Sequence, residues 1–141
     1  MSSTPADRSP PVRRIALICL LVAVSGCGGN DKKDAEQTVR DFVKAVNTSD
    51  ADKYCDELIT KDFLKKTTFS TGDEDRARES CKSQLKATTG LHVKLVKIVK
   101  TEVDGDDAAV TAVLERQGQR LRQRLKLKKE DGHWKLDGAG A

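Results

Sequence analysis

The chain has 141 residues, of which 34% are charged, and its 26 Lys and Arg against 22 Asp and Glu leave a net charge of +4. Residues 1–26 hold three of the basic residues and one of the acidic ones, so the net charge from residue 27 onward is only +2. This near balance excludes the strongly basic surface of a general nucleic-acid-binding protein, and the roughly 115 residues that remain fit one small domain.

Residues 1–26 have the layout of a secretory signal peptide. A basic leader with Arg8, Arg13 and Arg14 precedes the apolar run 15–24, and small residues follow it. The run has ten residues, about half of the roughly 20 that a bilayer-spanning helix needs. We therefore predict that residues 1–26 are cleaved and that the chain is exported.

The stretch Val24-Ser25-Gly26-Cys27 closes this leader and resembles the lipobox of bacterial lipoproteins. The resemblance implies cleavage just before Cys27 and attachment of diacylglycerol to its sulfur, which would anchor the protein to the outer face of the cell membrane. The alternatives are an ordinary secreted protein and a buried N-terminal helix. We expect residues 27–33 to be the lipidated cysteine and a short linker of at most about 20 Å, and residues 34–141 to form one domain.

Two of the four cysteines remain for the folded domain. Cys19 would leave with the signal peptide and Cys27 would carry the lipid, so Cys55 and Cys81 are left. Two thiols outside the cell favour one disulfide, whereas two buried reduced cysteines would require a reducing compartment.

Apolar residues at helical spacing predict three helices before residue 90. The first runs from Asp31 to near Asn47, the second covers residues 51–59, and Thr60 can cap a further turn. The third follows Thr71-Gly72-Asp73-Glu74, which has the spacing of a capping box. Because Cys55 and Cys81 each lie on the apolar face of their own helix, both should point into one core, where they can meet.

Beyond residue 90 the apolar period changes to two, which predicts four strands joined by turns at residues 104–106, 117–119 and 130–133. The alternation slips by one residue at Leu95-Val96, which indicates a β-bulge and a bent strand. The inward set of the second strand is Ala108, Val110, Ala112 and Leu114. The fold class predicted is α+β, with three N-terminal helices packed on a bent four-stranded antiparallel sheet.

This order of elements, together with the closing Asp131-Gly132-His133-Trp134-Lys135-Leu136, is similar to the nuclear transport factor 2-like (cystatin-like) superfamily over residues 31–137, in particular to its small secreted bacterial lipoproteins of unknown function. The resemblance implies a cone-shaped cleft between the sheet and the long helix. Catalytic members of the superfamily place carboxylates, His or Tyr inside that cleft.

The inward positions of this chain are nearly all aliphatic, so we predict no catalytic residue. Tyr54, Gln123 and Trp134 are the candidates for a pocket, although Gln123 can equally satisfy a backbone group, and an amide is neither a general base nor a nucleophile. His92 and His133 have no partner at ligand spacing, so neither a metal nor a cofactor is expected.

The remaining candidate site is a basic stripe on the third strand, where five cations alternate over about 26 Å: Arg120, Arg122, Arg124, Lys126 and Lys128. Anionic lipid or a cell-wall polymer would complement it, and a solvated face that prevents edge pairing is the alternative. Like charges disfavour self-association through this face, so we expect a monomer, or a dimer built elsewhere. The hypothesis is a non-catalytic binding or structural module, and the alternative is a small-molecule-binding protein or enzyme that uses the cleft.

Overall fold

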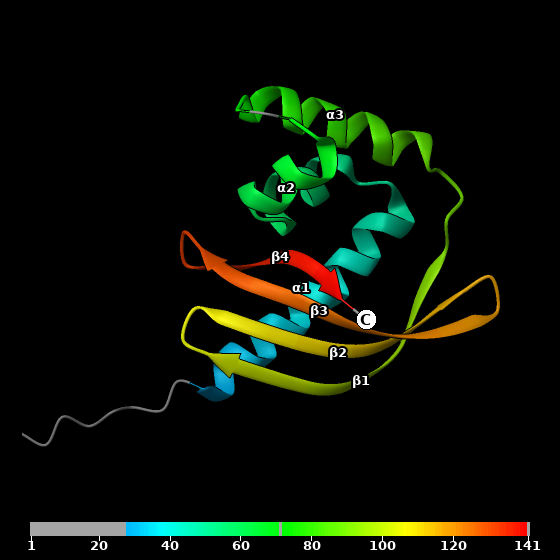
Figure 1. Ribbon diagram of the computed structural model, residues 1–141. Helices are drawn as coiled ribbons and strands as arrows, with labels where there is room; N and C mark the ends of the chain where they lie inside the picture. The colour runs from blue at the N-terminus through cyan, green and yellow to red at the C-terminus, as the bar shows by residue number, and fades with distance from the viewer. Residues whose placement is uncertain (1–27, 71, 141) are drawn as a thin grey trace, which may run out of the picture.

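The structure, a computed structural model, describes residues 28–70 and 72–140, so the predicted signal peptide, Cys27 and Thr71 lie outside the described residues. The helical part comprises α1 (Gly28–Thr48), a short π-helix η1 (Lys53–Leu58), α2 (Lys61–Thr68) and α3 (Glu74–Ala87). The strands are β1 (Val93–Asp104), β2 (Asp107–Arg116), β3 (Gln119–Glu130) and β4 (His133–Gly140). The predicted α+β class is confirmed (Figure 1).

The four strands form one antiparallel sheet in the order β1-β2-β3-β4. Gln117-Gly118 and Asp131-Gly132 make two-residue hairpin turns, and all four residues have positive φ, which matches the right-handed twist of the flanking strands. The predicted inward set of β2 is buried, with Val110 and Ala112 fully inaccessible to solvent. β2 therefore has one buried and one more exposed set of side chains, whereas the inward side chains of β1 are half-buried.

β-Bulges bend the sheet at three places. The predicted one is confirmed as a register shift between Leu95 and Lys97, and a second shift follows between Ile98 and Lys100. A third lies on β4, where Asp137 is the extra residue opposite the step from Lys126 to Leu127. Because each bulge inserts a residue and raises the local twist, β1 and β4 curve along their length.

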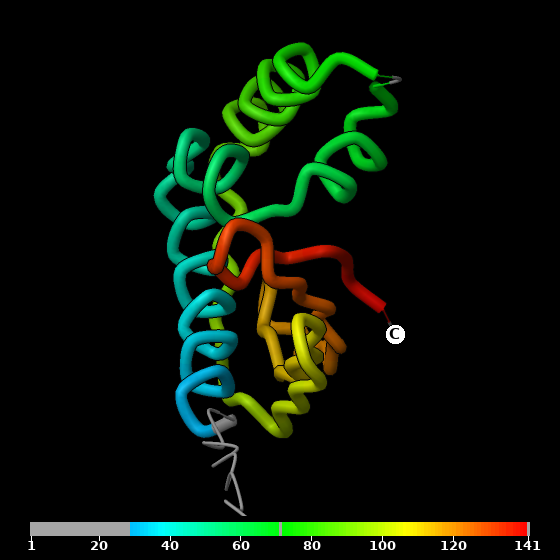
Figure 2. Tube along the Cα trace, turned by 90° about the vertical axis from the view of Figure 1, so that its left-hand side faces the viewer, coloured from blue at the N-terminus to red at the C-terminus, as the bar shows by residue number. Residues whose placement is uncertain are grey.

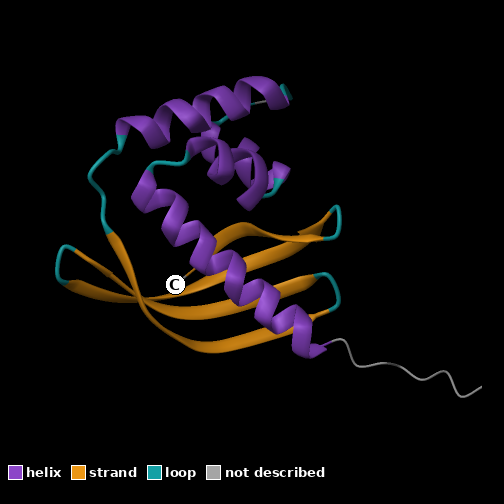
Figure 3. Cartoon of the chain, turned by 180° about the vertical axis from the view of Figure 1, so that it is seen from behind, coloured by secondary structure: helices purple, strands orange, loops and turns teal. Residues whose placement is uncertain are grey.

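Helix α1 lies across one face of the sheet and runs antiparallel to β1 (Figure 3). At its C-terminal end the Asn47 amide donates to the carbonyl of Val93 at 2.7 Å and accepts from its N–H at 2.8 Å. At its N-terminal end Lys129 donates to Asp31 at 2.7 Å. The helix begins at Gly28, so the linker predicted for residues 27–33 is wrong for Gly28–Lys33. The ion pair to Lys129 and the favourable position of Asp31 in the first turn outweigh the low helix propensity of the two glycines.

The other helical segments lie beyond the β4 edge of the sheet (Figure 1). Ile59 forms a parallel bridge with Leu136, and Thr60 caps α2 as predicted, its hydroxyl accepting from the N–H of Phe63. The predicted turn after Thr60 is a two-turn helix. The predicted capping box is wrong: Asp73 caps α3, accepting from the N–H groups of residues 75 and 76.

Cys55 and Cys81 form a disulfide between η1 and α3, with 6.1 Å between their Cα atoms. The pairing is the one predicted from their helical positions. Beside it, Lys82 on α3 contacts Asp52 and Asp56 at 2.7 and 2.8 Å. Both sulfurs belong to the main core cluster, so the bridge joins the outer helices to the apolar centre of the domain.

The core occupies one side of the sheet only, as the edge-on view shows (Figure 2). It joins α1 residues such as Val39 to Val110, Leu125 and Leu127 of the strands. No described helix covers the opposite side of the sheet, which faces the viewer in Figure 1. Among residues 28–70 and 72–140, no helix combines the length and apolar character needed to cross a bilayer.

Candidate functional site

The uncovered side of the sheet, here called the open face, is built from the positions that alternate with the core-facing ones. Residues directly opposite one another in antiparallel strands point to the same face, so the pairing defines five rows across β1, β2 and β3. The rows are Lys94–Glu115–Arg120, Lys97–Val113–Arg122, Lys100–Thr111–Arg124, Glu102–Ala109–Lys126 and Asp104–Asp107–Lys128.

All five residues of the predicted basic stripe on β3 are exposed on this face. The structure adds three lysines of β1, namely Lys94, Lys97 and Lys100. The sequence suggests Lys94, together with His92, as an extension of the stripe if their strand lies nearby, but it does not group Lys97 and Lys100 with the stripe. The two bulges hide them, because each bulge shifts the alternation by one residue and the three lysines are spaced three apart instead of two. A search for lysines on both sides of the predicted bulge would have found Lys94 and Lys97, but not Lys100, which follows the second bulge.

Charge is unevenly divided along the open face. Six cations share three neighbouring rows with one carboxylate, that of Glu115, and we call these six the basic patch: Lys94, Lys97, Lys100, Arg120, Arg122 and Arg124. The other two rows contain Lys126 and Lys128 together with three carboxylates, those of Glu102, Asp104 and Asp107. The stripe predicted on β3 is therefore divided, and only its first three members lie within a net positive surface.

Two carboxylates neutralise part of the basic patch. Glu102 accepts from Lys100 at 2.7 Å and from Arg124 at 2.8 Å, and these two cations lower its pKa. Glu115 accepts from Arg120 at 3.0 Å, and its pKa is lowered mainly by that hydrogen bond. Exposed pairs of this kind contribute little to stability, so these cations stay available to a stronger anionic ligand.

The middle row of the basic patch, Lys97–Val113–Arg122, differs from the other two rows in its ion pairing. Among the described residues, Lys97 and Arg122 take part in none of the ion pairs, and they lie on either side of the half-buried Val113. Lys97 and Arg122 belong to strands two spacings apart, about 10 Å, and the three cations of β3 cover about 14 Å. The patch therefore presents two lines of cations, one along β1 and one along β3, on either side of the uncharged Thr111 and Val113 of β2.

The three residues predicted to line one pocket are not brought together. Gln123 borders a cavity of about 200 Å³ beside Phe42 and Leu121, near the C-terminal end of α1. Trp134 borders a larger groove of about 770 Å³ at the other end of α1. Tyr54 borders neither and packs on Phe42 with ring centroids 5.4 Å apart, and burial raises the pKa of its hydroxyl.

The groove beside Trp134 is lined by charged side chains of α1, η1 and the β3–β4 turn. Lys129 lies 5.2 Å from the centre of the Trp134 ring and binds Asp31, whose pKa it lowers. The indole N–H of Trp134 is buried without a hydrogen bond of ordinary geometry, although Asp31 is near enough for the indole to contribute to the lowered pKa. The carboxylate nearest to this N–H is thus already bound to a lysine.

Within the described part of the chain, no three His, Cys, Asp or Glu side chains are grouped so that they could hold a metal ion. His92 and His133 are both exposed and lie at opposite ends of the sheet, at the start of β1 and the start of β4. The feature with a distinct chemical capacity is the basic patch, which can bind several negative charges at once.

Helices on one side of a curved antiparallel sheet define a nuclear transport factor 2-like fold. A nuclear transport factor 2-like protein of unknown function from Silicibacter pomeroyi has a TM-score of 0.52 and 16% identity, with 79% of this chain and 94% of that one covered. A de novo designed protein of this fold gives 0.46 at 18% identity, covering 76% and 84% of the two chains. A similar protein from Cytophaga hutchinsonii gives 0.43 at 15% identity, covering 75% and 88%.

At the level of sequence, the chain belongs to the family described as a domain of unknown function, DUF4878, whose model matches residues 25–137. No curated protein matches the chain. The structural likeness, at these identities, establishes the fold alone. Function has to be argued from the surface of this chain.

Proposed function

We propose that this chain is an exported protein, anchored through a lipid on Cys27, that acts outside the cytoplasm as a non-catalytic binding module. Its binding surface is the basic patch on the open face, and its ligand is anionic. The observation that carries the proposal is the row Lys97–Val113–Arg122. Its two cations form no ion pair with any described residue, and they lie on a face that no described helix covers.

The disulfide supports export. Disulfides persist in oxidising compartments and are rare in the bacterial cytoplasm, and Cys55–Cys81 lies within the core, where both sulfurs contribute to packing. The position of Cys27, directly before α1 and directly after small residues, supports its use as an attachment point. An anchor there would hold the domain close to the membrane surface.

The character of the cavity beside Gln123 supports a non-catalytic role for this part of the inner side. The cavity beside Gln123 has a volume of about 200 Å³, below the roughly 300–1,000 Å³ of typical ligand pockets. Its polar side chains are Gln123 and Arg116, and neither an amide nor a guanidinium can accept a proton at neutral pH. Apolar side chains of α1 and β2, among them Phe42 and Leu114, line the rest.

Lipidation is tested by Cys27→Ser, with Cys19→Ser as the matched control inside the signal peptide. We expect Cys27→Ser to leave the membrane fraction or to remain unprocessed, and we expect Cys19→Ser to behave as wild type. Mass spectrometry of the N-terminal peptide should show the diacylglycerol on Cys27 of wild type. If wild type and Cys27→Ser partition equally and no mass increase is found, the anchor is refuted.

Anion binding is tested with sodium polyphosphate as the probe and neutral dextran as its control. Wild type should bind polyphosphate with an affinity that falls as salt is added, because the interaction is screened over about 10 Å at 0.1 M ionic strength. The double variant Lys97→Glu with Arg122→Glu should lose at least about tenfold in affinity. Equal affinity of the two proteins at low salt would remove the basic patch from the proposal.

A further inference from the structure

We infer that the ligand of the basic patch is an extended anionic polymer lying beyond the membrane that holds the anchor, and not the lipid headgroups of that membrane. The inference rests on the proposed function and specifies its partner. It follows from where the chain enters the domain, how charge is distributed along the open face, and what shape the patch has.

The chain enters the domain at one corner of the sheet. Because α1 begins at Gly28, the lipid-bearing residue is its immediate neighbour, and adjacent Cα atoms are only about 3.8 Å apart. The start of α1 is fixed by the 2.7 Å bond between Asp31 and Lys129. The backbone N–H of Lys129 in turn donates to the carbonyl of Asp106 at 2.7 Å. The β1–β2 and β3–β4 turns are therefore the parts of the sheet nearest to the anchor.

This corner is the acidic end of the molecule. The two turns carry Asp104, Asp106, Asp107 and Asp131, and the first turns of α1 add Asp31 and Asp34. The lysines nearby are Lys32, Lys33, Lys128 and Lys129, of which Lys129 is already bound to Asp31. With six carboxylates against four lysines, an anionic membrane gains no net attraction from the part of the domain that it meets first.

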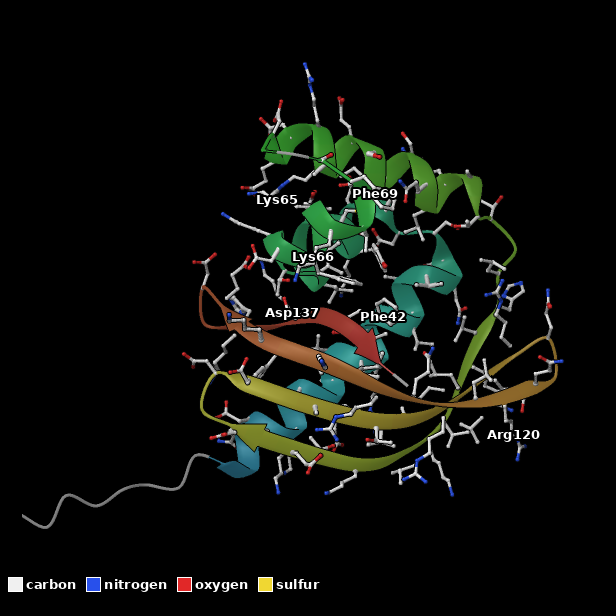
Figure 4. The ribbon with its side chains drawn as sticks, in the orientation of Figure 1. Phe42, Lys65, Lys66, Phe69, Arg120 and Asp137 are labelled. Carbon is white, nitrogen blue, oxygen red and sulfur yellow. A yellow bond between two sulfur atoms is a disulfide. The ribbon has the colours of Figure 1, made fainter. Side chains whose placement is uncertain are left out.

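The basic patch lies at the opposite end of the sheet. Helix α1 has 21 residues and so extends for about 30 Å, and its far end contacts Val93, next to Lys94. Arg120 lies at the same far end, away from the point where the chain enters (Figure 4). At 0.1 M ionic strength the row of Lys94 and Arg120 is thus about three Debye lengths from the anchor, and the row of Lys100 and Arg124, about 13 Å from the Asp104 end of β1, is more than one, so headgroups at the anchor act only weakly on the patch.

The shape of the patch also favours a chain over a plane. Long cationic side chains of β1 and β3 stand about 10 Å apart, on either side of the shorter, half-buried Thr111 and Val113. The space between them runs along the strands. A linear polymer with phosphates or carboxylates on both sides fits between the line of cations on β1 and the line on β3, whereas a flat bilayer surface meets only the tips of these side chains.

The test uses the lipidated protein in two kinds of vesicle, one of phosphatidylcholine alone and one of two parts phosphatidylcholine to one part phosphatidylglycerol. Polyphosphate affinity is measured for both at about 0.1 M salt. If the patch points away from its own membrane, the two affinities should agree within about threefold. If the patch rests on the headgroups, anionic lipid will compete and lower the affinity by about tenfold or more.

Two matched variants complete the design, each reversing two charges on the open face. Lys97→Glu with Arg122→Glu should abolish most polyphosphate binding in both vesicles, and Lys126→Glu with Lys128→Glu should change it by less than about threefold. Absence of polyphosphate binding by wild type in neutral vesicles would overturn the proposed function itself. Binding that is suppressed only by anionic lipid, or equal losses in both variants, would leave that function standing and overturn the inference.

Discussion

The two faces of this sheet are made by the same four strands, yet they differ in burial and in charge. On the covered face Val110, Leu125 and Leu127 are at most 2% exposed and pack against α1. On the open face their sequence neighbours Thr111, Arg124 and Lys126 are half-buried or exposed. Packing on the covered face determines the fold, and the side chains of this face are buried or half-buried beneath the helices. No described helix packs on the open face, so packing of the core does not account for its clustered cations.

The largest effect that separates the two faces is expected from one substitution made on each. Val110→Asp would bury a carboxylate in the core, where it has no partner, so we expect a loss of at least about 4 kcal/mol in the free energy of unfolding. Val113→Asp places the same group on the open face between two cations and should cost about 1 kcal/mol or less. Urea denaturation measures both. Similar losses would contradict the assignment of Val113 to an uncovered face.

A second test concerns the helices that extend the covered side beyond β4. Replacing both Cys55 and Cys81 by Ala removes a bridge that spans 26 residues, and we expect a loss of about 3–4 kcal/mol. Wild type treated with a reductant should show the same loss, which separates the effect of the bond from that of the substitutions. A double variant as stable as oxidised wild type would mean that α3 does not depend on its link to the core.

A smaller effect on stability is expected at β4, the edge strand of the sheet that lies next to α2. Thr60 is 2% exposed, and its hydroxyl donates to Asp137 at 2.6 Å while accepting from the N–H of Phe63. Thr60→Val should cost about 1–2 kcal/mol, because it removes the cap of α2 and a hydrogen bond to a charged group. Thr60→Ser keeps the hydroxyl and should retain more than half of this stability. A loss for Thr60→Ser as large as that for Thr60→Val would show that the methyl group contributes as much as the hydroxyl and would contradict this assignment.

The smallest effect is a dependence on pH at the corner where α1 begins. Lys129 lowers the pKa of Asp31, so this carboxylate stabilises the fold above its ordinary pKa of about 3.9, and the contribution disappears as pH falls through the lowered value. The difference in unfolding midpoint between wild type and Lys129→Met should thus be constant near neutral pH and shrink in acid. Lys128→Met, on the neighbouring outward position, is the control and should give no such change.

The covered side could be predicted from the sequence in most respects. Burial imposes alternation on β2, and the inward positions of Ala108, Val110 and Ala112 could be predicted because every inward residue of this strand is aliphatic. The disulfide was evident for the same reason, since the helical period places Cys55 and Cys81 among apolar neighbours. Core residues recur at regular intervals in the sequence because each of them must lie on the same side of its helix or strand.

The open face could be predicted only in part. The stripe on β3 was visible because its cations alternate within one strand, but Lys97 and Lys100 could be assigned to the same face only with the register of β1 against β2. The second bulge was missed because Thr101, a polar residue, points inward and donates to Glu36 on α1. Alternation also fails to give position along a strand, which is why Gln123 and Trp134 were placed together although they lie at opposite ends of the sheet.

The bulged strand β1 has a further consequence if copies of the protein are anchored to one membrane as proposed. Anchoring confines molecules to two dimensions and raises their encounter rate, and a free strand edge would then invite end-on growth of one sheet from the next. Val96 and Val99 each interrupt the ladder of β1, and the amide of Asn47 occupies both backbone groups of Val93. A crowded layer of this protein should therefore remain a layer of separate molecules, each with its own sheet, instead of joining into fibrils.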